Sequence, residues 1–127
     1  MKVGEHDQAL RLVLSSIDIQ QRVGKFLHMP ALFRMKGLIL ASRSVEDYLE
    51  AEGSLLSAID WAKRQSAGLF ELKAATDLAE LLLKQDRVPH AYKHLGAALD
   101  RTPAGIVSPA HERARQIFSQ SGTKSVS

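Results

Sequence analysis

The chain has 127 residues, of which 45% are hydrophobic and 6% aromatic, and it carries a formal net charge of +3 with no cysteine. This length is typical of one domain, and the lack of cysteine excludes thiol nucleophiles, disulfides and cysteine-ligated metal centres. The basic residues are scattered, whereas nucleic-acid-binding domains gather them in one run or on one face.

Apolar residues recur at spacings of three and four along almost the whole chain, which predicts about six helices and no strand. The first segment ends at Gly24, a residue that readily takes the left-handed conformation found after helices. The second begins at Pro30, which the first turn of a helix tolerates. Ser44, with Asp47 three residues later, predicts the start of a long third helix that Gly68 ends.

The second half of the chain repeats this scheme with two further helical stripes. A tight polar turn at 85–87 separates them. Ser108 and Pro109, a capping residue followed by a proline in the first helical position, start a last helix that we expect to end near Gln120. The polar residues 121–127 are then expected to form a flexible tail.

Two of the predicted helix pairs share one pattern of small residues. Gly37 and Ala79 take the same position in the first helix, and an Ala–Leu–Ala pattern recurs in the second, at Ala51, Leu55 and Ala58 and at Ala91, Leu95 and Ala98. This pattern resembles the tetratricopeptide repeat, in which small residues let antiparallel helices approach closely. We therefore predict one all-α domain of antiparallel helix pairs, stacked as a short tetratricopeptide-like right-handed superhelix. Its parts are a half repeat at 4–24, repeats at 30–65 and 69–102, and a capping helix at 108–120.

The pattern begins with half a repeat, and a repeat cannot bury its apolar face without neighbours. We therefore expect the first helix to carry an uncovered face, available to a partner or to a second copy of the chain. The residues predicted for this face are Leu12, Val13, Ile17 and Trp61. Two interpretations of Trp61 stay open: packing against a neighbouring helix pair, or an interface anchor of the kind enriched in binding hot spots.

Two stretches also resemble a particular family. L-F-R-M-K-G at 32–37 is similar to its E-L-x-R-L-K-G-E-L segment, and A-I-D-W-A-K-R-Q-S-A-G-L-F-E-L-K-A-A at 58–75 is similar to its A-I-x-x-A-R-x-Q-G-A-x-x-x-E-L-R-A-A. These segments belong to C-terminal helical-repeat regions of large bacterial proteins with a predicted P-loop ATPase module, often with a nucleotide cyclase or DNA-binding domain. Ser66 departs from the pattern, which has Gly there. The resemblance implies a sensing or docking region, since that family's ATP-binding and cyclase residues lie in other domains.

Residues that suggest catalysis or metal binding are few. His90 and His94 lie four apart on one predicted helix, a spacing that can chelate a metal, but no third ligand accompanies them. Neighbouring carboxylates such as Glu50 and Glu52 are typical of a solvated helix face. The sequence has neither a glycine-rich phosphate loop nor a nucleophile elbow. We therefore predict no enzyme, no metal site and no cofactor.

The resemblance to tetratricopeptide repeats also predicts a concave groove lined by the first helix of each pair. The groove residues in this register are Arg34, Leu38, Ala41, Lys73, Thr76, Glu80 and Lys84. Three cations and one acid make a mildly positive groove, which suits an acidic peptide or a C-terminal carboxylate. The asparagines that clamp a carboxylate in such domains are absent, because the chain contains no Asn.

Three functions remain open at this point. The first is a non-catalytic protein–protein interaction module, an adaptor or scaffold that is free-standing or forms the docking part of a bacterial signalling regulator. The second is a structural homodimer formed through the uncovered face of the first helix. The third is a nucleic-acid-associated regulator, which the scattered cations and the absence of a recognition helix disfavour. The sequence signals no small-molecule substrate. With no apolar signal core and no apolar run near the roughly 20 residues that span a membrane, we expect a cytoplasmic protein.

Overall fold

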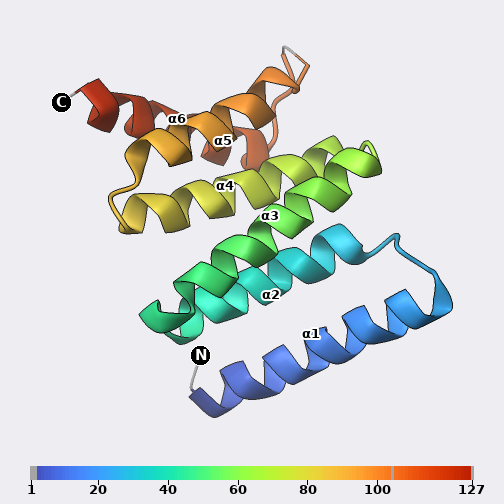
Figure 1. Cartoon of the computed structure of the whole chain (residues 1–127). Helices are drawn as coiled ribbons and strands as arrows, with labels where there is room; N and C mark the ends of the chain where they lie inside the picture. Colours follow the sequence, from blue (N-terminus) through green and yellow to red (C-terminus); the bar gives the residue numbers. More distant parts are fainter. Residues whose placement is uncertain (1–2, 104, 127) are drawn as a thin grey trace.

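The computed structural model describes residues 3–103 and 105–126, with side chains described for 4–103 and 105–120. These residues form six α-helices and one short 3₁₀ helix, with no strand among them (Figure 1). The elements are α1 (Val3–Val23), α2 (Met29–Arg43), η1 (Val45–Asp47), α3 (Tyr48–Arg64), α4 (Gly68–Lys84), α5 (Val88–Asp100) and α6 (Pro109–Val126). The predicted all-helical class with about six helices is thereby confirmed.

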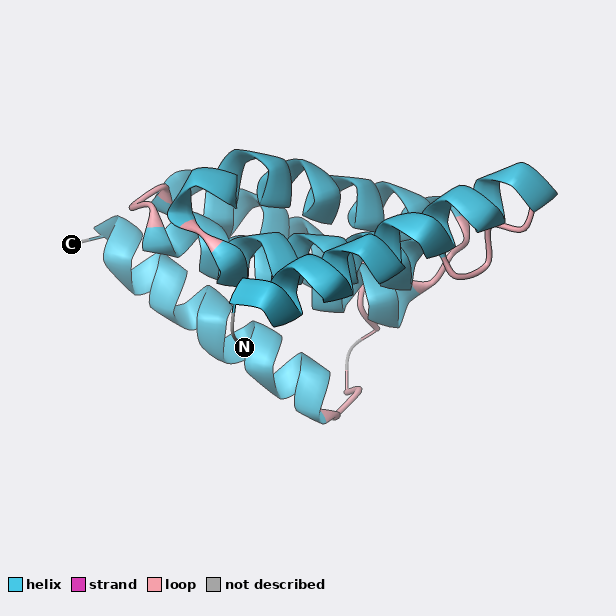
Figure 2. Cartoon of the chain, turned by 90° about the horizontal axis from the view of Figure 1, so that it is seen from below, coloured by secondary structure: helices cyan, strands magenta, loops and turns pink. Residues whose placement is uncertain are grey.

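Consecutive helices run antiparallel and pack on one another, so the chain forms a stack from α1 to α6 (Figure 1). Helices α2, α4 and α6 also contact one another in succession. Loops lie near the ends of the helices (Figure 2). We call the surface formed by α2, α4 and α6 the inner face.

Helix α4 is the centre of the stack, because it contacts α2, α3, α5 and α6. Most of its residues are buried, and its sequence is accordingly apolar nearly all round. Its buried residues are Glu71, Leu72, Ala74, Ala75, Thr76, Asp77, Leu78, Ala79, Leu81 and Leu82. They form one core with the small residues Ala51, Ala58, Ala91 and Ala98 of α3 and α5.

A second, smaller core lies at the α1 end of the stack. Val13 and Ile17 of α1 pack there with Met29 and Ile39 of α2, and the half-buried Trp61 of α3 covers them. Within the described residues, no helix combines the length and the apolar character needed to cross a membrane.

Three of the turns between helices have the same backbone geometry. Gly24, Ser66 and Asp86 each adopt a positive φ, of 70°, 54° and 57°. After each, the next amide donates to the carbonyl five residues back, as in the link of 2.8 Å from Ala67 to Ala62. The predictions of Gly24 as a helix end and of a turn at 85–87 are confirmed.

The predicted end of the third helix at Gly68 is wrong. Helix α3 ends at Arg64, and Gly68 is the first residue of α4. The left-handed position after α3 belongs to Ser66, so a serine occupies a conformation that glycine adopts more readily. The prediction placed the helix end at the nearest glycine, but the hydrogen bonds from the Ser66 and Ala67 amides back to α3 show that the helix has already ended before Gly68.

Both predicted capping residues accept a backbone hydrogen bond, but Ser44 caps the 3₁₀ helix η1 and not α3, which begins at Tyr48. The Ser44 hydroxyl accepts a hydrogen bond from the Glu46 amide, and the Ser108 hydroxyl accepts one from the His111 amide. Helix α6 continues beyond the expected end at Gln120, so 121–126 is helical, while the last residue of the expected tail lies outside the described residues.

Helices α2 and α3 approach closely at Gly37. A Cβ atom at this position would lie 2.7 Å from Leu55 Cγ and 3.2 Å from the carbonyl oxygen of Ala51. Real Cβ atoms avoid contacts this short, so the absence of a side chain allows this helix pair to close.

Replacement of Gly37 by alanine is therefore expected to destabilise the fold by about 1–3 kcal/mol, because crowding of Leu55 outweighs the better helix propensity of alanine. Gly53 of α3 is the matched control, since a Cβ atom there meets nothing within 4 Å. Gly53→Ala should stabilise the protein by about 0.5–1 kcal/mol. Urea unfolding measures both, and equal effects of the two changes would contradict the close approach.

Candidate protein-binding surface

A line of four charged residues runs along the inner side of α4. Lys73, Asp77, Glu80 and Lys84 are spaced by four, three and four positions, which places them on one side of a helix. Three of the four were predicted as groove residues, and Asp77 was not. The structure brings these predicted residues together on one surface.

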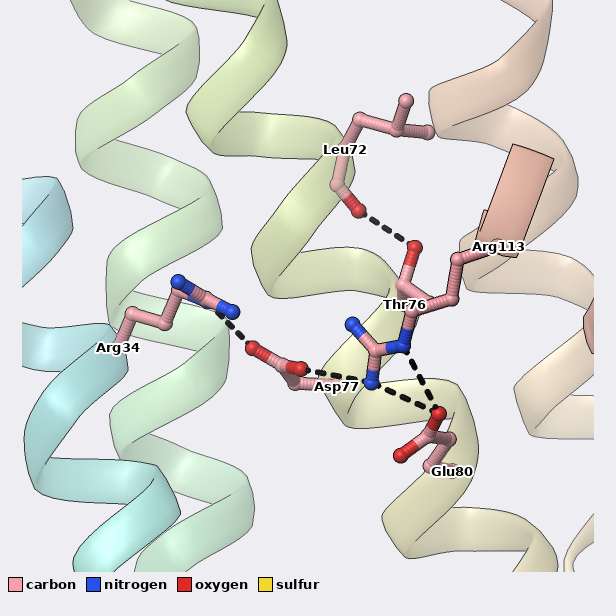
Figure 3. A network of polar contacts seen from close by, with 6 residues as sticks. All are labelled: Arg34, Leu72, Thr76, Asp77, Glu80 and Arg113. Carbon is pink, nitrogen blue, oxygen red and sulfur yellow. Dashed lines mark hydrogen bonds and ion pairs between the residues drawn. The ribbon is translucent and has the colours of Figure 1, made fainter. Parts of the chain in front are cut away.

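Asp77 joins three helices through its carboxylate (Figure 3). Arg34 Nε of α2 lies 2.5 Å from Asp77 Oδ2, and Arg113 Nη2 of α6 lies 3.1 Å from Asp77 Oδ1. Arg113 Nη2 also lies 2.7 Å from Glu80 Oε1. The Asp77 side chain is only 2% exposed, so its charge depends on these partners. We call Arg34, Asp77, Glu80 and Arg113 the inner charge network.

The inner charge network is electrically neutral, since two guanidinium groups face two carboxylates. Burial alone would lower the pKa of the Arg113 guanidinium, but hydrogen bonds and charges from Glu80 and Asp77 outweigh burial and raise that pKa above its usual value. Arg113 therefore stays charged, and both arginines are engaged with acids. Arg34, predicted as a groove cation, pairs with Asp77 through its Nε, and its side chain remains 28% exposed.

The positive charge that remains along α4 belongs to Lys73, in its second turn, and Lys84, its last residue. Neither Lys73 nor Lys84 makes an ion pair within the part of the chain that the structure describes. Lys73 Nζ lies 5.7 Å from the ring centroid of Phe70, a cation–π contact that leaves the ammonium group open to a further partner.

Thr76 is not a groove residue, contrary to the prediction. It is 1% exposed, and its hydroxyl donates to the carbonyl of Leu72 at 2.7 Å (Figure 3). Neighbouring helices cover α4 on several sides, so only a narrow line of its residues reaches the surface. Leu38 of α2 is partly exposed as expected, and Ala41 is half-buried.

Two hollows lie beside α4 on its α6 side, one near each lysine. The first has a volume of about 480 Å³ and a mostly apolar lining. Its lining residues include Leu69, Lys73, Ile106, Pro109, Ala110 and His111. The second has a volume of about 320 Å³ and is lined by Glu80, Leu83, Lys84, Ile117 and Gln120. The inner charge network lies between the two.

The predicted partner face of α1 is only partly exposed. Leu12 is 64% exposed, but Val13 and Ile17 are 4% and 7% exposed because they pack against α2. The expectation that the latter two form an uncovered face is therefore wrong. Trp61 stacks on Phe26 with 5.3 Å between ring centroids and packs on the α1–α2 core, contacts that favour the packing interpretation.

The two histidines with chelating spacing lie on α5 in different environments. His90 is exposed, whereas partial burial lowers the pKa of His94, with smaller contributions from the charges of Lys93 and His90. No cluster of three or more His, Asp or Glu residues suited to a metal ion occurs within residues 3–103 and 105–126.

Two residues that hold the candidate surface together, Asp77 and Arg113, were not predicted as site residues. One signal was available for Asp77, an acid in the middle of the most apolar helix, where aspartate has low helix propensity and a buried charge needs a partner. No local pattern marks Arg113 as that partner, because the two residues are 36 positions apart.

Comparison of this chain with protein-family models, curated proteins and solved structures finds no match.

Replacement of Asp77 by asparagine is expected to cost about 2–4 kcal/mol of stability, because Arg34 would then lie partly buried without a counter-charge. Glu80→Gln is the matched control, since this carboxylate is 39% exposed and its loss should cost less than about 1 kcal/mol. Urea unfolding in low salt measures both changes. Equal losses would contradict the central role of Asp77.

Proposed function

We propose that this chain is a non-catalytic protein-interaction module that binds a partner on its inner face. One observation carries this proposal: two lysines without an ion-pair partner and two hollows lie beside a neutral charge network that joins α4 to α2 and α6. A rigid helical surface with open cations and apolar hollows suits an extended segment of another protein.

The resemblance of 32–37 and 58–75 to the repeat regions of bacterial multidomain regulators supports the same proposal, since those regions sense or dock. In this proposal the module acts in the bacterial cytoplasm as an adaptor or as the docking part of a signalling regulator. It requires neither a cofactor nor a small-molecule substrate. Binding to nucleic acid is disfavoured, because the arginines of the inner face already pair with acids.

Selection from a displayed library of random peptides tests this function. The chain should enrich binders whose affinity falls at least about tenfold in the inner-face variant Leu38→Glu/Lys84→Glu. The outer-face variant Leu49→Glu/Lys93→Glu is the matched control, because both residues are exposed on α3 and α5, and it should bind as the unmodified chain does. Failure to enrich any binder, or equal losses in the two variants, would reject the inner face as the binding surface.

A second candidate function, self-association through α1, is favoured by a different observation. Leu12, Ile19 and Val23 are 64%, 54% and 58% exposed, and their spacing of seven and four positions places them on one side of the helix. Among the described residues α1 packs only on α2, so this apolar stripe has no neighbour within the chain. A second copy that covered it would bury apolar side chains worth about 1.5–3 kcal/mol each.

Light scattering behind a sizing column, over a hundredfold range of concentration, tests this association. The unmodified chain should show the mass of a dimer, and Leu12→Asp/Ile19→Asp should show that of a monomer, since charge in an apolar contact is costly. The control Leu49→Asp changes an exposed residue of α3 and should leave the chain dimeric. A monomeric unmodified chain would exclude this function, and a dimer that survives Leu12→Asp/Ile19→Asp would place the contact elsewhere.

A further inference from the structure

The two lysines of α4 that make no ion pair have a fixed separation. Lys73 and Lys84 are eleven positions apart on α4, which corresponds to about 16 Å and roughly three turns of helix, so both face the same side. The helix between them is held by the inner charge network, which joins α4 to α2 and α6. The surface therefore presents two positive charges at a defined spacing.

Each lysine lies at a hollow, which is mostly apolar at Lys73 and mixed in character at Lys84, where Glu80 and Gln120 also line it. Lys73 lies beside Leu69, Ile106 and Pro109, and Lys73 is the only residue of that lining with a full formal charge. Lys84 lies beside Leu83 and Ile117 in the second hollow, where the carboxylate of Glu80 is bound by Arg113. Each hollow thus offers an ammonium group with apolar side chains beside it, Leu69 and Ile106 in the first and Leu83 and Ile117 in the second.

The complement of this surface is a ligand with two acidic groups, each next to an apolar side chain. An extended polypeptide advances about 3.3 Å per residue and its side chains alternate between two sides, so acids four or six residues apart point to one side and roughly match the distance between the lysines. Over the neutral middle, uncharged polar residues fit better than acids, because Glu80 remains partly exposed there.

The chemistry of the two cations selects among acidic ligands. Planar, bidentate recognition of a phosphate or a terminal carboxylate is typical of arginine, and the two arginines of this surface are already bound to acids. The lysine ammonium group acts as a point charge and donates hydrogen bonds to the carboxylate of an aspartate or glutamate side chain. A single C-terminal carboxylate would also leave one of the two lysines unused.

We propose, on the basis of the protein-binding function above, that the inner face takes an extended internal peptide segment with two acidic side chains four or six residues apart, so that both point to the same side. Lys73 binds one acid and Lys84 the other, and the apolar residues beside the acids enter the two hollows. The partner is thereby a protein with an exposed acidic-apolar segment, not a nucleic acid.

Fluorescence anisotropy with synthetic peptides, acetylated and amidated at their ends, tests the proposal. The probe is Leu-Asp-Ser-Gly-Ser-Asp-Leu, in which the acids are four positions apart and so point to the same side of an extended chain. Three comparison peptides replace both Asp by Asn, place the two Asp side by side, or carry one Asp with a free C-terminal carboxylate. We expect the probe to bind at least about tenfold more tightly than each of the three, and more weakly as salt rises.

Charge reversal on the protein supplies the second arm. Lys73→Glu and Lys84→Glu should each weaken binding of the probe at least about tenfold. Lys93→Glu, at an exposed position of α5, should leave binding of the probe unchanged. Lys73→Gln removes the charge without reversing it, and it replaces Lys73→Glu if charge reversal beside Phe70 disturbs the fold. Helicity measured by circular dichroism verifies that each variant is folded.

Binding that is equally tight for the Asn peptide, for adjacent acids or for the lysine variants would overturn the proposal, as would equal binding of the single C-terminal carboxylate. The peptide library distinguishes this failure from that of the proposed function. Library binders that need the inner face but carry no acid pair would leave the interaction module standing without this ligand. Absence of both kinds of binder would overturn both.

Discussion

The arrangement of the inner face depends on one buried carboxylate, that of Asp77. An acid with a 2% exposed side chain is tolerable only if cations reach it, and here they arrive from the helices on either side, as Arg34 of α2 and Arg113 of α6. Helix α4 therefore cannot rotate or slide against either neighbour without leaving this charge uncompensated. Apolar packing of alanine and leucine alone would tolerate small shifts far better, so the charge pairs add specificity of register to a core that supplies the burial.

This internal pairing also decides which charges remain for a partner. Similar pairs at the edges engage other charges, among them Arg87 with Glu52 and Arg101 with Glu71. The cations left on the inner side of α4 are then the lysines near its two ends, next to the hollows along α6. The stabilising network and the proposed binding groups are thus parts of one line of side chains, in which the middle holds the helices and the ends face the solvent.

Local signals in the sequence were enough for the helices and their pairing. Periodicity, Gly24, Ser44 and Ser108 predicted the elements, and Gly37 marked the close approach of α2 and α3, because each acts through neighbours on its own helix or turn. Residues whose environment is set by distant segments were not predictable in this way. Arg34 has the same local signature as a free groove cation, and only its contact with a residue 43 positions away shows that it is engaged. Val13 and Ile17 were likewise assigned to the wrong side of α1, since periodicity finds an apolar stripe but not which side of it a neighbour covers.

The two proposed contacts use different parts of the stack and are compatible with each other. Helix α1 packs only on α2 among the described helices, whereas the hollows and the two lysines lie along α4 and α6. Two copies joined through α1 would therefore keep both inner faces available, and a partner with two acidic segments would meet both at once. Its second segment would then bind at a high effective concentration, so modest contacts with four lysines would combine into a much tighter complex. Self-association at α1 would in this way strengthen binding at α4 without adding any residue to the inner face.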